Sequence, residues 1–402
     1  MKIGVWIPAD YQPTEGGGFS YFDRLVKAID AYSFDKDLDV CYVTTSESPL
    51  LFKREVVRLT AHPRGTLTER IKKHLPLVGW HFQQQLTKRL AEERFSIYRQ
   101  QLVDNGVRIL YYPSSGRDIP NFPFIATNWD IGHLSTYAFP EVSMDGQFKS
   151  RNHYYTSVLP QALMVFCESE AGKQELIRFT NIKEDKLRVV PIFAGGCIDE
   201  VVDVRRQTEI LEHFQLKKNR FFFYPAQFWA HKNHFGVLRA LKDFVITHPD
   251  FKLVLTGSDH GNLAYVKKLI NEYSLNENVA YLGFVDMDTV YTLYRNAAAL
   301  VMASYFGPTN MPPLEAISLG CPVICTDLAG HHEELGDAAL YFDAKDAAAI
   351  CTCMKTVVAD NVDFRKKVEG QSKKTDFRLE IALSRINKYF IEASNIRATW
   401  DQ

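Results

Sequence analysis

The sequence predicts an α/β protein built from two doubly wound domains. Short apolar runs, rich in β-branched and aromatic residues, alternate with amphipathic stretches along the chain. Strands that alternate with helices form parallel sheets covered on both faces. The alternation pauses near residues 193–205 and then restarts. We therefore expect one Rossmann-like domain over residues 1–195 and another over 196–380.

Each expected element is a short run bounded by polar or glycine-rich turns. In the first domain we expect a helix over 19–31 and strands over 2–8, 38–45, 108–113, 124–129, 163–169 and 187–193. In the second we expect strands over 220–226, 251–257, 279–285, 298–304, 322–327 and 338–343. Ligands of such sheets bind beyond the carboxyl ends of the strands. The cleft between the two domains is therefore the expected active site.

Composition excludes several classes of protein. The 402 residues are 46% hydrophobic and 24% charged, with a formal net charge of -1, which argues against a disordered chain and against a polycation that binds nucleic acid. The seven cysteines are scattered and form no CxxC pair, so we expect reduced thiols in a cytoplasmic protein. No apolar run is long enough to span a membrane, so we expect a soluble protein or one on a membrane surface.

Residues 53–99 differ in charge from the rest, with eleven Lys and Arg against four Asp and Glu. One interpretation is a solvated helical hairpin packed on the first domain. The other is a peripheral patch that meets anionic lipid or an acidic acceptor. The residues assigned to that patch are Lys72, Lys73, Trp80, Lys88 and Arg89.

The segment 304–322 reads as a strand end, a turn and a helix that starts at a proline pair. A helix N-terminus then holds the backbone N–H groups of Thr309, Asn310 and Met311. Phosphate binds well at such a terminus. Glu315 on the first turn could accept both hydroxyls of a ribose. The alternative is a capped helix with a glutamate that only favours the helix dipole.

The segment 221–236 is a buried strand followed by a loop with several polar and aromatic residues. Lys232 stands where the strand passes into the next helix, and there it can meet a diphosphate as a point charge. The alternative is a solvated surface lysine. The neighbouring aromatic residues favour a partly dry site.

Two further segments follow strands of the first domain. Gly16, Gly17 and Gly18 form a glycine-rich turn that lets the backbone approach a ligand, although the GxGxxG pattern of a nicotinamide site is absent. Asp130 and His133 follow the strand over 124–129 and face the expected cleft. For His133 a structural role and a catalytic or sugar-binding role both remain open.

Two patterns suggest a metal but have simpler explanations. Asp286-Met287-Asp288 is a DxD sequence that opens a helix, and we interpret Asp288 as its N-cap. The run His331-His332-Glu333 lacks the i, i+4 spacing of a zinc helix. We therefore expect no metal site.

Taken together, the motifs YPAQFWAHKNH, LTGSDHGN, YLGFV, FGPTNMPPLEAISLGCPV and GDAALYFD resemble the family-4 retaining glycosyltransferases of GT-B fold. The segments WDIGHLSTYAFPE, CESEAGKQEL and LRVVP extend the resemblance into the first domain. Within that family, the chain looks most similar to bacterial enzymes that build O-antigen or capsule. The resemblance implies two domains facing across a cleft, the first on the acceptor side and the second binding the donor. It also implies a closing helix over 381–402 that crosses back to the first domain.

The resemblance assigns roles to individual positions of this sequence. Lys232 matches the lysine that binds the donor, and Glu315 matches the glutamate that binds ribose. The other donor-binding positions it implies are Gly17, Gly18, Gln227, Gly283, Phe284, Val285, Gly307, Thr309, Asn310 and Met311. Among these, Gly283–Val285 match the loop near the nucleobase.

The chain departs from the family pattern at three places. Gly307 stands where many members have Glu, Gln227 where many have Arg, and Trp129 where many have His. Loss of the Arg and the Glu leaves the identity of the donor sugar open. The leaving diphosphate would then depend on Lys232 and on backbone donors.

The function implied is transfer of a hexose or deoxyhexose, with retention, from a nucleotide diphosphate sugar to a lipid-linked or oligosaccharide acceptor. Lys232, His133 and Asp130 are the expected catalytic residues, with no metal or other cofactor and no nucleic-acid partner. The expected location is the cytoplasm, at the inner face of the cell membrane. A non-catalytic nucleotide-sugar-binding scaffold is the alternative from another class, and a sugar-nucleotide epimerase is a third reading.

Overall fold

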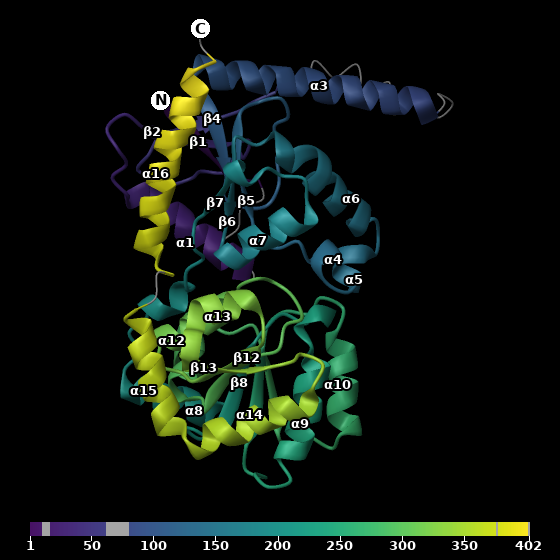
Figure 1. Ribbon diagram of the computed structural model, residues 1–402, viewed down its shortest axis with the longest axis vertical. Coiled ribbons are helices and arrows are strands. Elements are labelled where there is room, and N and C mark those ends of the chain that lie inside the picture. Colours follow the sequence, from purple (N-terminus) through teal and green to yellow (C-terminus); the bar gives the residue numbers. More distant parts are fainter. Residues whose placement is uncertain (10–16, 62–79, 375–376, 401–402) are drawn as a thin grey trace.

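The computed structural model describes residues 1–9, 17–61, 80–374 and 377–400 (Figure 1). Within these residues, two parallel sheets in separate domains confirm the predicted fold class. The first sheet has the order β3-β2-β1-β4-β5-β6-β7. Its strands are β1 (Lys2–Ile7), β2 (Asp39–Thr44), β3 (Val56–Arg58), β4 (Val107–Tyr112), β5 (Phe124–Asn128), β6 (Met164–Cys167) and β7 (Leu187–Val189).

The second sheet has the order β10-β9-β8-β11-β12-β13, and its neighbouring strands are again parallel. Its strands are β8 (Phe221–Pro225), β9 (Lys252–Thr256), β10 (Val279–Gly283), β11 (Ala299–Met302), β12 (Val323–Thr326) and β13 (Ala339–Phe342). The chain switches direction along each sheet beside its first strand, β1 or β8. At such a switch point the loops beyond the carboxyl ends leave room for a ligand.

Helices cover both faces of the first sheet. The long helices of this domain are α1 (Gly17–Ala31), α3 (Trp80–Asp104) and α7 (Glu170–Phe179), and the short ones are α4 (Gly132–Ser135), α5 (Pro140–Ser143) and α6 (Gln147–His153). Apolar side chains of α1 and of the closing helix α16 (Leu379–Ala398) share one core with the sheet. Side chains from α3 and α7 share the core on its other face.

The second domain has a single large core around β8 to β13. Its helices are α8 (Val204–His213), α9 (His234–Phe244), α10 (Leu263–Glu272), α11 (Met287–Asn296), α12 (Met311–Ser318), α13 (Ala329–Leu335), α14 (Ala347–Ala359) and α15 (Asn361–Ser372). Figure 1 shows α12 and α13 at the end of this domain that meets the first. These two helices therefore bring their residues to the domain boundary.

The closing helix α16 packs on the first domain although it follows α15 of the second (Figure 1). Leu383, Ile386 and Phe390 are buried in the first core, and the Phe390 ring lies 5.4 Å from the ring of Tyr111. The chain therefore crosses between the domains twice, once before α8 and once between α15 and α16.

The basic segment 53–99 is described only in part, because residues 62–79 lie outside the described residues, so the helical hairpin stays a prediction. Residues 56–58 form β3, an edge strand paired with β2, and α3 is one helix of 25 residues that extends beyond the body of the first domain (Figure 1). Lys88 and Arg89 are exposed on α3. Trp80 opens α3, but its side chain lies outside the described residues, as do Lys72 and Lys73.

Two further observations concern the cysteines and the hydropathy of the helices. All seven cysteines are free, and six of them are buried. Among the described residues, no helix is long and apolar enough to cross a membrane.

Candidate active site

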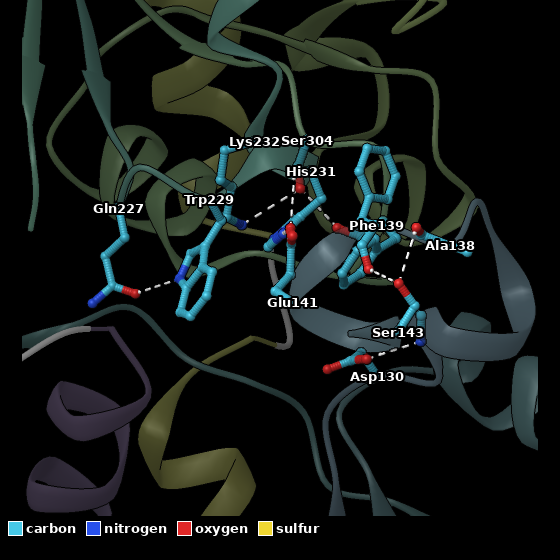
Figure 2. A network of polar contacts seen from close by, with 12 residues as sticks. Asp130, Ala138, Phe139, Glu141, Ser143, Gln227, Trp229, His231, Lys232 and Ser304 are labelled. Atoms are coloured by element: carbon cyan, nitrogen blue, oxygen red, sulfur yellow. Dashed lines mark hydrogen bonds and ion pairs between the residues drawn. The ribbon is translucent and has the colours of Figure 1, made fainter. Parts of the chain in front are cut away.

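Lys232 lies where the loops after β8 and β11 meet. It ends a short 3-10 turn, Ala230–Lys232, just after β8. Its Nζ donates to Asn310 Oδ1 at 3.2 Å. It also donates to Ser304 Oγ at 3.4 Å (Figure 2). Ser304 follows β11, and Asn310 is the N-cap residue of α12. The structure thus brings together the lysine and the helix N-terminus that the sequence assigned to a diphosphate.

Burial lowers the pKa of Lys232 to about 8, against the opposing effect of Asp130 and Glu141 from the first domain. The ammonium form still dominates at neutral pH. A cation that has already lost much of its hydration interacts more strongly with an incoming anion than a solvated one.

The turn before α12 is closely backed by α13. Gly307 has a φ of 99°, which a side chain would strain. A Cβ at Gly330 of α13 would meet the Pro308 carbonyl oxygen at 1.6 Å, so only glycine allows this approach. Met311 begins α12, and its N–H has no partner within the helix, whereas Pro312 and Pro313, which follow it, carry no N–H. Thr309 Oγ1 is buried with no hydrogen-bond partner in the part of the chain that the structure describes.

Glu315 is buried, with both carboxylate oxygens already in use. Oε1 accepts from the Gly195 N–H at 3.2 Å, and Oε2 accepts from the Tyr294 hydroxyl at 2.6 Å. Burial raises the pKa of Glu315. A ribose at this carboxylate would have to share it with Gly195, which lies in the segment joining the domains.

The loops after β9 and β10 flank the turn after β8. Gly283 ends β10 with a φ of 69°, Phe284 is 67% exposed and Val285 is half-buried. The exposed Phe284 ring is free to stack on a flat ligand. These residues lie where the family resemblance places the nucleobase.

Gln227 and Trp229 form a polar and aromatic wall on the second domain. Gln227 Oε1 accepts from Trp229 Nε1 at 3.0 Å (Figure 2). The indole stacks on His260 with ring centroids 4.1 Å apart and planes 10° apart. Gln227 therefore holds an aromatic ring in place and adds no charge to the site.

On the first domain, Asp130 follows β5, and its carboxylate contacts residues of its own domain. Its Oδ1 accepts from the Gly132 N–H at 2.9 Å and forms an ion pair with Arg151. The ring of His133 is buried beside Phe148 and Tyr155. A direct contact between His133 and a sugar would require those rings to move.

Burial lowers the pKa of His133 to about 4, so its ring is neutral at pH 7. Both ring nitrogens are buried and have no partner among the described residues. The structure places Gly17 and Gly18 as the first residues of α1. Gly16, which completes the expected glycine-rich turn, lies outside the described residues.

One buried pair joins the two domains beside Lys232, and it was not predicted from the sequence. Glu141 of α5 accepts from the His231 N–H at 2.9 Å and also contacts His231 Nδ1 (Figure 2). Burial and the charge of Lys232 lower the pKa of His231 to about 4. Burial alone would raise the pKa of Glu141, but the hydrogen bonds from His231 lower it. The pair is therefore a neutral imidazole that donates to a carboxylate.

A second contact between the domains uses Glu333 of α13. Its two carboxylate oxygens accept from the backbone N–H groups of Glu170 and Ala171, each at 3.0 Å. These N–H groups open α7, so a side chain of the second domain caps a helix of the first. The run 331–333, which the sequence marked only as a failed zinc pattern, thus contributes to the domain boundary.

An aspartate of the DxD sequence caps a helix, as expected, but it is not the aspartate that we expected. Asp286, not Asp288, is the N-cap of α11, and its side chain accepts from the Thr289 N–H at 2.9 Å. Asp288 lies in the first turn. Either aspartate would satisfy the sequence preference for a cap, and only the backbone path distinguishes them. Among the described residues, no group of three or more His, Cys, Asp or Glu side chains could hold a metal ion.

Comparison with known proteins bears on the part of the chain that carries Lys232. Residues 206–375 match the model of the glycosyl transferases group 1 family. The matched segment runs from within α8 to just past the end of α15, so it includes the second sheet and the helix α12.

Two curated relatives of the chain carry the name O-antigen chain mannosyltransferase. Mannosyltransferase B of Escherichia coli is 24% identical over 270 residues, which are 63% of this chain and 70% of the relative. RfbU of Salmonella typhimurium is 25% identical over 141 residues, which are 35% of this chain and 39% of the relative. Both likenesses are distant.

The solved structure of Anabaena HepE in complex with UDP and glucose resembles this chain in both of its domains. It has a TM-score of 0.69 at 14% identity and covers 98% of this chain and 100% of its own. At this identity the likeness concerns the fold. It extends the GT-B arrangement over both domains.

Proposed function

We propose that the protein transfers a hexose or deoxyhexose from a nucleotide diphosphate sugar to a hydroxyl of a lipid-linked or oligosaccharide acceptor. The observation that carries this proposal is the position of Lys232. A partly desolvated ammonium lies beside the N-terminus of α12, at the carboxyl end of a doubly wound sheet. A cation beside the backbone N–H of Met311, at the positive end of the helix dipole, favours a diphosphate.

In this proposal the second domain binds the donor and the first domain presents the acceptor. The bond between the anomeric carbon and the diphosphate oxygen breaks, and negative charge develops on the diphosphate. Lys232 and the N–H groups of Thr309–Met311 stabilise that charge, which is the role of preorganised donors in group transfer. The acceptor oxygen then bonds to the same face of the sugar, and its proton passes to the departing phosphate, which gives retention.

The names of the relatives support a role in surface polysaccharide assembly. Those curated proteins are O-antigen chain mannosyltransferases, so mannose is the first donor sugar to test. The projecting helix α3 carries the exposed Lys88 and Arg89, and we assign them to contact with an acidic acceptor or anionic lipid headgroups. That contact would hold the protein at the inner face of the cell membrane.

The test is a calorimetry panel of UDP, GDP, dTDP, ADP and CMP, with their sugars, on the wild type and on Lys232→Ala. We expect one diphosphate to bind the wild type and to bind the variant much more weakly, because the variant lacks the cation. If no nucleotide binds the wild type, the donor site proposed here is wrong.

The activity should depend on pH through Lys232. The pKa of Lys232 is lowered to about 8, and the charged form, which exists below that pKa, is the form that binds the diphosphate. We therefore expect kcat/KM to be level near pH 7 and to fall as pH rises through about 8, since kcat/KM reports the free enzyme. A profile that stays level to pH 10 would contradict this assignment.

Chelation of divalent metal should leave the transfer rate unchanged. Lys232 and the α12 N–H groups supply the stabilisation of the leaving diphosphate in this proposal, so no step requires a metal. The measurement is the initial rate with and without EDTA, followed by addition of Mg²⁺ or Mn²⁺. A loss of activity in EDTA that metal restores would contradict metal independence.

A second candidate function is a non-catalytic scaffold that binds nucleotide sugars. It is favoured by the replacement of Arg by Gln227 and of Glu by Gly307, because both changes remove groups that many relatives of the family carry. A scaffold would bind the donor without turnover with any acceptor. A sugar-nucleotide epimerase would instead convert the donor when no acceptor is present.

A further inference from the structure

We infer that His331 acts through Asn310 as a positioning residue for the Lys232 ammonium. The inference rests on the proposed function only for what Lys232 binds. His331 is fully buried in α13 and Asn310 precedes α12, so neither is on the loop that carries Lys232. One line of hydrogen bonds therefore joins α13, the turn before α12 and the loop after β8, through His331, Asn310 and Lys232.

The bonds of His331 fix which of its ring nitrogens carries the proton. Nδ1 lies 2.7 Å from the Thr326 carbonyl oxygen, which can only accept, so Nδ1 carries a proton. Burial lowers the pKa of His331 to about 4, so the ring is neutral and Nε2 is an acceptor. Nε2 lies 3.0 Å from Asn310 Nδ2, which therefore donates to it.

This donation sets the orientation of the Asn310 amide. With Nδ2 turned to His331, Oδ1 faces Lys232 and accepts from Nζ at 3.2 Å. A rotation of the amide by half a turn would point N–H dipoles at the ammonium and leave His331 Nε2 without a donor. Both effects cost free energy in a buried site, so His331 selects the orientation that binds the cation.

The other acceptor of Lys232 is fixed in the same way. Ser304 Oγ donates its own proton to the Phe306 carbonyl oxygen at 2.8 Å, so its lone pairs are free to face Nζ. Two of the three N–H groups of the ammonium are thus directed to known acceptors. The remaining N–H group is available to a phosphate oxygen.

The backbone keeps this line rigid. The Pro308 carbonyl packs directly on Gly330, the residue before His331, in the contact that a Cβ would block. The turn that carries Asn310 and the helix that carries His331 therefore move as one unit. A ligand that binds at the turn would meet an ammonium whose direction is already set.

The first test measures the pKa of Lys232 without any substrate, by NMR of protein labelled at lysine Cε, with the signal assigned by its loss in Lys232→Arg. In His331→Leu the acceptor for Asn310 is lost, and we expect the pKa of Lys232 to fall by about half a unit or more, because an oriented acceptor stabilises the charged form. His331→Gln can place an oxygen where Nε2 lies and should restore most of the wild-type value.

The matched control is His332→Leu, on the same helix. His332 is exposed and its Nε2 contacts Asp327 Oδ1 at 2.7 Å, away from the line to Lys232. We expect no change in the Lys232 pKa in this variant. Melting temperatures of all variants show which of them are folded. A Lys232 pKa that His331→Leu leaves unchanged, in a folded protein, overturns the inference.

The second test is a double-mutant cycle on the transfer reaction. We expect His331→Leu to lower kcat/KM about tenfold, and to have little further effect in protein that already carries Asn310→Ala, because the two residues act in series. Additive losses overturn the inference. If the wild type binds no nucleotide while the NMR result holds, the proposed function fails and the positioning role stands.

Discussion

Lys232→Ala is expected to lower the transfer rate about 10²–10³-fold while the protein stays folded, since this is the usual loss when one preorganised donor is removed from a developing negative charge. The variant removes the donor to Asn310 Oδ1 and Ser304 Oγ, which accept from Nζ in the wild type. Water can replace the ammonium there, so the core is not disturbed. The measurement is kcat with a saturating donor, together with a thermal melt.

A matched control separates this effect from a general loss of positive charge. Lys268→Ala removes an exposed lysine of α10, which pairs with Glu272 at 3.5 Å. We expect that variant to keep wild-type kcat. If Lys232→Ala keeps its rate within tenfold of the wild type, Lys232 is not the group that stabilises the leaving diphosphate.

Phe390→Ala is expected to destabilise the protein by about 3–5 kcal/mol, the usual cost of replacing a buried phenylalanine by alanine. The Phe390 ring is fully buried and lies against Tyr111, Phe34 and Phe166 at centroid distances of 5.4, 5.8 and 6.5 Å. These contacts hold α16 on the first sheet. A loss of this size lowers the melting temperature by roughly 10 °C.

The control for this prediction is Ser384→Ala, which changes an exposed position of the same helix. We expect its free energy of unfolding in urea to stay within about 0.5 kcal/mol of that of the wild type. Both proteins should be compared by urea unfolding as well as by heat. A Phe390→Ala protein as stable as the wild type would mean that α16 contributes nothing to the first core.

The sequence predicted the sheets well because each strand of a covered parallel sheet is a continuous apolar run. The runs over 220–226 and 298–304 contain β8 and β11, and the polar residues after them lie at the site. Strand β3 was not predicted because three residues at the edge of a sheet carry little pattern, and pairing with β2 fixes them.

The contacts between the domains could not be predicted from the sequence. Glu141 and His231 are 90 residues apart, and no pattern in either segment indicates that they pair. Their pairing depends on how two folded domains meet. His331 was judged only against the spacing of a zinc helix, whereas its position depends on the close approach of Gly330 to Pro308. The available signal in the sequence was a glycine directly before a histidine.

The two crossings of the chain limit how the domains can move. A single chain segment between the domains would let one domain rotate about three axes relative to the other. Here the chain passes before α8 and again between α15 and α16, so the allowed motion approaches rotation about the line that joins the two passages. Such a hinge swings the opposite side of the boundary, where Glu141 meets His231, through the widest arc. A rotation about that line would change the distance between Asp130 and Lys232 while it leaves the packing inside each domain unchanged.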